Sequence, residues 1–174
     1  MTDALLRLLG ECLPLFLAAA LHEIGHLSAC LVLRVPVRFL HSSLTGAVIG
    51  YDSTRTSYPA EAVIAAAGPL FGLLGTVCVL RSVSRQAALF GTASLALSLF
   101  NLLPITPLDG AVILSALLSC RLSPHTVSRI LRATSCVCAV LLWMSAVTVQ
   151  LRCGGNLSLL FISVLMLTKI TEKY

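Results

Sequence analysis

The sequence predicts an all-α polytopic membrane protein with about five transmembrane helices. Of its 174 residues, 57% are hydrophobic and only 11% are charged, and the mean hydropathy is +0.97. A soluble domain of this size would carry about 25% charged residues. Apolar runs of the length that a helix needs to cross a bilayer, about 20 residues, recur along the chain. We therefore expect a single membrane-embedded domain over residues 1–174, with no separate soluble domain.

Five segments are expected to cross the bilayer, and the third is interrupted around Pro104 to Pro107. Their approximate ranges are 12–33, 59–80, 87–120, 129–149 and 157–170. Non-helical backbone at membrane depth persists only where protein or a water-filled cavity satisfies its polar groups. The interruption therefore indicates a polar interior at that point. The first span lacks a basic leader and a cleavage site, so we expect it to be retained as a helix rather than removed as a signal.

The segment between Pro36 and Tyr58 does not fit a membrane span. It is too short and too polar, and it combines β-branched residues with turn formers. This pattern favours a short β-hairpin, which we expect to re-enter the membrane after the first span. An ordinary cytoplasmic loop is the alternative.

The basic residues predict the orientation of the chain. The formal charge is +5, and in a membrane protein such an excess sets orientation rather than binding nucleic acid. Eight Lys and Arg residues follow spans one, three and five, namely Arg34, Arg38, Arg55, Arg121, Arg129, Arg132, Lys169 and Lys173. The opposite side has Arg7, Arg81, Arg85 and Arg152. The first set is expected to be cytoplasmic, which places the N-terminus outside and the C-terminus inside.

The seven cysteines do not predict a disulfide framework. Most of them lie in apolar helical runs, their number is odd, and no pair has the spacing of a zinc clamp. We interpret them as small apolar packing residues.

The first span contains a motif of ionisable side chains, whose burial in lipid costs free energy. Residues 22–26 read His22-Glu23-Ile24-Gly25-His26. A helix places positions i and i+4 on one face, so the two imidazoles can bind one Zn²⁺, and the intervening Glu can act as general base. Ionisable side chains in an apolar span indicate a functional site. The motif therefore predicts a metal hydrolase that works inside a membrane.

A catalytic zinc site usually has three protein ligands, so a third must come from elsewhere. The acidic residues are Asp3, Glu11, Glu23, Asp52, Glu61, Asp109 and Glu172. Only Asp109 lies deep in an apolar segment, directly after the proline interruption. At 1.5 Å per residue, His22 and Asp109 each lie about 18 Å from the arginine that ends their span. Similar depth favours Asp109 over the other histidines, His41 and His125, which are expected in cytoplasmic loops.

These residues resemble the site-2 protease (M50) family of intramembrane zinc metalloproteases. The resemblance rests on the motif at 22–26, on Gly68-Pro69 in the second span, and on the segment Asn101-Leu102-Leu103-Pro104-Ile105-Thr106-Pro107-Leu108-Asp109-Gly110. That last segment is most similar to the branch that contains the stage IV sporulation protease. The resemblance covers a three-helix catalytic core at about 10–120, whereas accessory helices at about 128–171 match only in character.

The resemblance implies regulated intramembrane proteolysis of a membrane-tethered protein, such as a sporulation sigma-factor precursor or an anti-sigma factor. The implied site has one Zn²⁺ per chain, with His22, His26 and Asp109 as metal ligands and Glu23 as the general base. The implied substrate-binding residues are Asn101 and Pro107. The hairpin would pair with an unwound strand of the substrate. Further implied partners are the lipid bilayer and a regulatory membrane protein.

Two departures from the family pattern concern substrate gating rather than chemistry. The family often has Gly-Pro-x-x-Asn in the second core helix, but Gly72 stands at the place of that asparagine. Many members have an earlier helix, whereas only 21 residues precede His22.

The same residues allow four other interpretations. The histidines could hold helices together as a polar pair. A membrane protease for prenylated proteins would need a glutamate as third ligand, and Glu61 lies too close to the surface. A metal transporter should show an internal repeat, and none is present. A catalytically inactive protease-like scaffold remains open.

Overall fold

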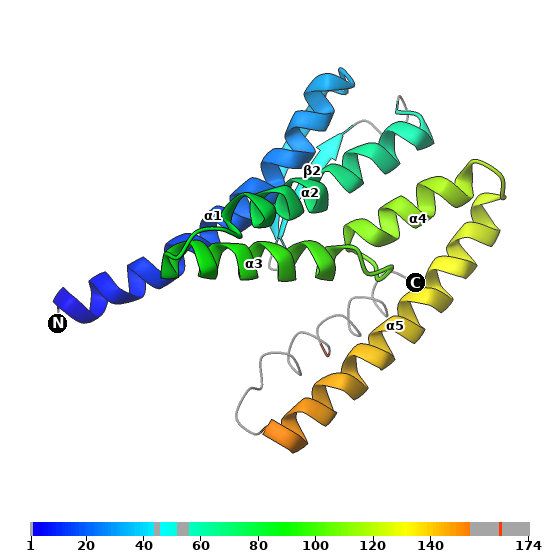
Figure 1. Cartoon of the computed structure of the whole chain (residues 1–174). Coiled ribbons are helices and arrows are strands. Elements are labelled where there is room, and N and C mark those ends of the chain that lie inside the picture. Colours follow the sequence, from blue (N-terminus) through cyan, green and yellow to red (C-terminus); the bar gives the residue numbers. More distant parts are fainter. Residues whose placement is uncertain (1, 44–45, 52–55, 154–163, 165–174) are drawn as a thin grey trace. The chain divides into compact units, whose positions relative to one another are not determined.

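The computed structural model describes residues 2–43, 46–51, 56–153 and 164. Their elements follow the order α1 (Thr2–Val32), β1 (Val37–Ser43), β2 (Gly46–Tyr51), α2 (Tyr58–Val79), α3 (Arg85–Asn101), α4 (Asp109–Ser119) and α5 (Pro124–Cys153) (Figure 1). The described part is therefore helical apart from one pair of strands. The chain divides into two compact units, 1–102 and 103–174, and each is described by itself.

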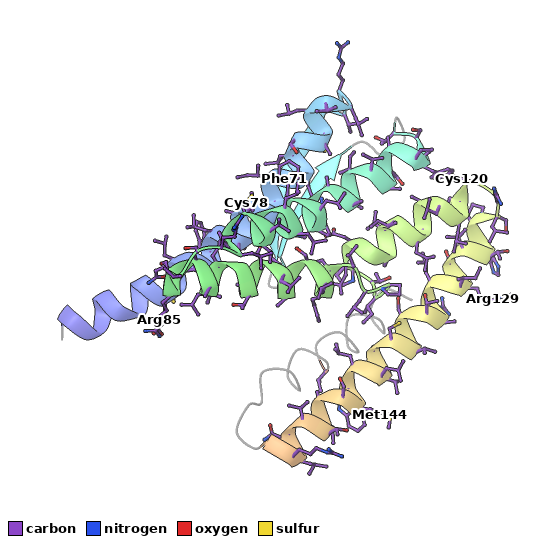
Figure 2. All side chains as sticks on the ribbon, in the orientation of Figure 1. Phe71, Cys78, Arg85, Cys120, Arg129 and Met144 are labelled. Carbon is purple, nitrogen blue, oxygen red and sulfur yellow. The ribbon has the colours of Figure 1, made fainter. Side chains whose placement is uncertain are left out.

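Three helices are long and apolar enough to cross a membrane: Gly10–Val32, Tyr58–Val79 and Pro124–Arg152. They correspond to the first, second and fourth expected spans. Large apolar side chains on these helices are exposed, including Phe16 at 69%, Leu74 at 61% and Met144 at 56%. Met144 is labelled on α5 in Figure 2. Apolar faces of this extent need a partner in water, whereas a bilayer covers them. The helices thus fit a multi-pass membrane protein.

The third expected span consists of two short helices with an irregular segment between them. α3 has 17 residues and α4 has 11, and the interruption at residues 102–108 contains both predicted prolines. The predicted break is therefore present, but neither helix alone has the length of an ordinary span. The fifth expected span lies outside the described residues except for residue 164, so the number of spans stays a prediction.

α1 ends in a turn that leads the chain directly into β1. Arg34 has a positive φ of 55°, and the Val35 N–H donates to the Cys30 carbonyl at 2.9 Å. This combination is the left-handed ending that closes many helices. Pro36 follows and prevents the helix from continuing. The sequence therefore stops α1 about two turns after His26.

The two strands pair antiparallel in the segment where the hairpin was expected. Leu40 pairs with Ile49 and Ser42 with Ala47, and the register shifts between Val37 and Phe39. β2 also contacts α1. Residues 44–45, which connect the strands, lie outside the described part. That this segment re-enters the membrane stays a prediction.

Within the first unit, α1, α2 and α3 pack against one another. α2 begins with proline in its first turn and carries Glu61 there, which suits the missing N–H partners and the positive dipole of a helix start. α2 meets α3 through small residues. The Ser94 hydroxyl donates to the Gly72 carbonyl at 2.9 Å, and the Thr76 hydroxyl to the Gly91 carbonyl at 3.2 Å. Small residues with such hydrogen bonds are how helices associate tightly in apolar surroundings.

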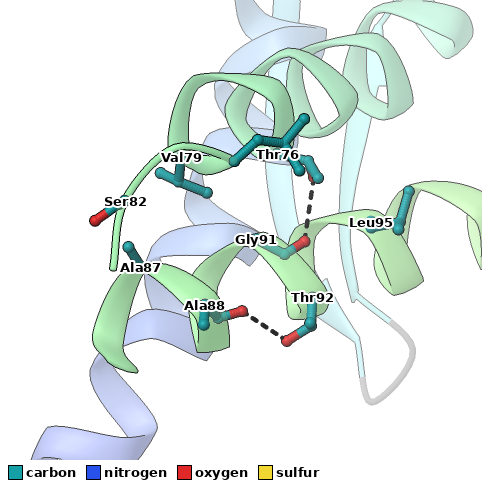
Figure 3. A pocket seen from close by; sticks show the side chains of 9 residues that line it. Thr76, Val79, Ser82, Ala87, Ala88, Gly91, Thr92 and Leu95 are labelled. Carbon is teal, nitrogen blue, oxygen red and sulfur yellow. Dashed lines mark hydrogen bonds between the residues drawn. The ribbon is translucent and has the colours of Figure 1, made fainter. Parts of the chain in front are cut away.

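Figure 3 shows the cavity at the end of this interface, beside the turn from α2 to α3. Its volume is about 250 Å³. The bond between Thr76 and Gly91 forms part of its wall. The interface is therefore tight near Gly72 and opens toward the α2–α3 turn.

The second unit contains α4 and α5, which pack through Ala111, Val127 and Leu131. Ser135 of α5 is fully buried and holds the segment that precedes α4. Its hydroxyl accepts from the Thr106 N–H at 3.1 Å and lies 3.3 Å from the Pro104 carbonyl, to which it donates. The non-helical backbone before Asp109 is thus satisfied by protein, as an apolar environment requires.

Candidate functional site

The two histidines of the sequence motif lie side by side on α1. His22 is 4% exposed and His26 is 8% exposed. Their Nε2 atoms are 3.2 Å apart, and the rings meet edge to face with centroids 4.8 Å apart. Two imidazole nitrogens at this distance need a proton or a cation between them, since their lone pairs repel. The structure therefore brings together the two nitrogens that the helical spacing predicts.

A carbonyl of α2 fixes the orientation of His26. Its Nδ1 lies 2.8 Å from the carbonyl oxygen of Ile64, in a buried contact. Because a carbonyl can only accept, Nδ1 is the protonated nitrogen in this contact, and in the neutral imidazole Nε2 then carries the lone pair. Histidines that bind metals usually donate their other N–H in this way.

The geometry of the pair fits one tetrahedral metal ion. Two nitrogens at bond lengths of 2.0–2.1 Å from zinc lie about 3.3 Å apart when the site is tetrahedral. The observed separation of the two Nε2 atoms is 3.2 Å. The donor set and its spacing therefore suit Zn²⁺, which imidazole nitrogens bind well.

Glu23 is half-buried between the two histidines on the same helix. Its neighbour Ile24 is 52% exposed and belongs to the outward apolar face. The carboxyl group thus belongs to the partly buried side of α1, one residue from His22, where a base for the chemistry is expected.

Asp109 is the first residue of α4 and is half-buried. It lies in the second unit. The preceding segment is anchored by the buried Ile105 and Leu108 and by the two hydrogen bonds of Ser135. A carboxylate at a helix start is favoured by the helix dipole. Its role as a metal ligand stays a prediction.

The other predicted site residues have different environments. Asn101 ends α3, is half-buried, and donates from its side-chain amide to the Leu97 carbonyl at 3.0 Å. Pro107 is exposed in the interruption. Their roles in substrate binding stay predictions. His41 lies in β1, within the segment where the hairpin was expected. The exposed His125 lies in the first turn of α5 rather than in a loop, because that helix begins at Pro124.

Three residues support the histidines or the segment before Asp109, and none of them was predicted to have that role. Ile64 contributes a backbone carbonyl, and any residue type can do so. Gly68 lies against the His26 ring, and the Gly68-Pro69 pair inside an apolar span was its signal. Ser135 lies 26 residues after Asp109, with no pattern to connect them.

Two comparisons define the class of protein to which this chain is similar. Residues 79–144 match Peptidase family M50, whose members are metalloproteases. The matched range contains Asn101, Pro107 and Asp109, and it does not include His22, Glu23 or His26.

The solved structure of the site-2 protease from Methanocaldococcus jannaschii is similar to the chain, with a TM-score of 0.70 and 22% sequence identity. The likeness covers 92% of this chain and 75% of that chain. No curated protein sequence shows a significant match. The chain therefore has the site-2 protease fold.

Proposed function

We propose that the chain is an intramembrane zinc metalloprotease that hydrolyses a peptide bond in or near the transmembrane segment of a membrane-tethered protein. The observation that carries the proposal is the buried pair of His22 and His26 on an apolar helix, with Nε2 atoms 3.2 Å apart. The site-2 protease fold and the match to family M50 over residues 79–144 support it.

One Zn²⁺ would be held by His22, His26 and Asp109, whose side chains are of the types that could hold a metal ion. Two imidazoles and one carboxylate form a common ligand set of catalytic zinc and leave a position open. When bound, zinc lowers the pKa of water and polarises a carbonyl.

Glu23 would act as the general base. Its position next to His22 on α1 suits removal of a proton from the attacking water. The same carboxyl group would then deliver that proton to the leaving amine. Without such a base the water attacks slowly, even when it is correctly placed.

The substrate must unwind before it can be cleaved, because a transmembrane helix hides its carbonyls in internal hydrogen bonds. Addition of the unwound segment as a strand to the edge of the β1–β2 sheet would replace those bonds. Asn101 and Pro107 would help to position this strand. A sporulation sigma-factor precursor or an anti-sigma factor would be such a substrate. The zinc site would lie toward the cytoplasm. A regulatory membrane protein would control access of the substrate to it.

Metal analysis of the purified protein, together with a cleavage assay on single-span substrates, tests the proposal. Wild-type protein should bind one zinc and cleave. Glu23→Gln should keep the zinc, and its cleavage rate should fall by about 10²–10⁴-fold. Glu11→Gln is the matched control, since Glu11 lies on the same helix in an exposed ion pair with Arg85. Normal turnover by Glu23→Gln, or wild-type protein without zinc, would reject the assignment.

A further inference from the structure

We propose that α2 positions His26 for metal binding, with the Ile64 carbonyl holding one side of the ring and the absence of a side chain at Gly68 leaving room for the other. The inference rests on the proposed metal site. It assigns a role to α2, to which the sequence motif on α1 does not point.

The hydrogen bond from His26 to Ile64 is shielded from water. Ile64 is 2% exposed and His26 is 8% exposed, and the Nδ1–O distance is 2.8 Å. A backbone carbonyl cannot rotate away or change its charge, so it is a fixed acceptor. It therefore selects the tautomer whose Nε2 can bind a metal.

Gly68 leaves the space that the ring occupies. A Cβ at this position would collide with Nε2, Cε1 and Cδ2 of His26. Ile64 and Gly68 are four residues apart and thus on the same face of α2, separated by about 6 Å along its axis. The imidazole therefore lies across one turn of α2, with Nδ1 bonded to Ile64 and its Nε2 side against Gly68.

A second glycine brings the two helices into backbone contact. A Cβ at Gly25 would lie 2.5 Å from the Ala67 carbonyl oxygen and 2.9 Å from the Gly68 Cα. Glycines on both helices permit this close crossing. Since His26 directly follows Gly25, the crossing is what brings the Ile64 carbonyl within reach of the ring.

A glycine that serves packing alone would behave differently from a glycine that positions a ligand. Gly75 provides the comparison, because it also lies on α2 and a Cβ there would meet Leu21 of α1 and Phe90 of α3. No histidine is among these neighbours. Gly75→Ala thus disturbs helix packing without touching the ring, whereas Gly68→Ala displaces the ring.

Zinc affinity, measured by competition with a chelator, separates the two roles when combined with thermal unfolding of the metal-free proteins. Gly68→Ala should bind zinc about 10–100-fold more weakly than wild type, the usual cost of losing an outer contact of a ligand. Gly75→Ala should keep a zinc affinity near that of wild type, even if its unfolding temperature falls as much as that of Gly68→Ala. Wild-type affinity in Gly68→Ala, or equal losses in both variants, would overturn the inference.

The tautomer of His26 provides a test that does not need the Gly68 variant to fold. Nitrogen NMR of histidine-labelled, metal-free wild-type protein should show Nδ1–H on the signal that His26→Gln removes. A proton on Nε2 instead would overturn the positioning role. If wild-type protein binds no zinc, the proposed function fails, and the tautomer still decides whether α2 orients this ring.

Discussion

His22 and His26 are buried, yet they lie on a helix whose neighbouring positions face outward with apolar side chains. Ile24, between them, is 52% exposed. The helical period alone separates these faces, because residues 22 and 26 share one side and residue 24 lies on the other. A lipid-facing surface and a polar site can therefore coexist on α1 within five residues.

Asp109→Ala should weaken zinc binding more than the 10–100-fold that loss of an outer contact costs, because a direct ligand is removed. Chelator competition on the purified variant measures this. Glu61→Ala is the control, since Glu61 is also a half-buried acid in the first turn of an apolar helix. Unchanged zinc affinity in Asp109→Ala would exclude the carboxylate as a ligand.

At the scale of residues, the sequence could predict the features of the site that depend on spacing along one helix. His22 and His26 lie on the same face of α1 because they are four residues apart. Their support by Ile64 could not be predicted, because the acceptor is a main-chain atom 38 residues away. The choice of Asp109 depended on elimination among few acids, which was feasible only because the chain is so apolar.

At the scale of elements, the contact between α2 and α3 gives a reason for one departure from the family pattern. Gly72 stands where the family often has asparagine, and a Cβ there would collide with the Ser98 hydroxyl and lie 3.3 Å from that of Ser94. Both serines are fully buried. An asparagine has no space in this interface, so the glycine is a consequence of close helix packing.

Gly72→Ala should lower the free energy of unfolding by about 1–3 kcal/mol, the usual cost of overpacking a dense core. Ser98→Ala removes the colliding hydroxyl, so the double variant should recover much of that loss. Unfolding of the single and double variants in detergent measures this coupling. Strictly additive effects would show that the two positions do not compete for the same space.

The helices themselves were predictable from apolar runs. The interruption between α3 and α4 was predictable as well, because two prolines, Pro104 and Pro107, stand close together there, whereas the single prolines Pro14 and Pro69 lie inside α1 and α2. The glycine contacts were not predictable in the same way. Gly25, Gly68 and Gly72 differ from other glycines only through what lies opposite them on another helix. Such pairings depend on how helices cross, and the spacing of residues along a single helix does not reveal this.

At the scale of the whole molecule, the match to family M50 and the histidine motif lie in different parts of the chain. The match to family M50 covers residues 79–144, whereas the histidines precede it on α1. The fold likeness spans 92% of the chain and therefore includes both parts. The proposed function thus depends on combining a short motif with a fold, neither of which would be sufficient alone.

The excess of basic residues predicts which ends of the helices face the cytoplasm, and two exposed serines allow a direct test. Ser84 lies in the turn between α2 and α3 beside Arg81 and Arg85, and Ser123 lies between α4 and α5 beside Arg121. In a background without the seven native cysteines, each serine can be replaced singly by cysteine. The side of the membrane with more Lys and Arg residues is retained inside. Ser123 lies on the predicted side with eight of them and Ser84 on the side with four, so a membrane-impermeant maleimide should label Ser84→Cys in intact cells.

Ser123→Cys should react only after the cells are permeabilised. Labelling after permeabilisation shows that each thiol is reactive, which is the control for a buried site. The reverse pattern would place the N-terminus in the cytoplasm and the proposed zinc site nearer the outer face. Because cleavage releases its product to the side that faces the site, this result also decides on which side of the membrane the product appears.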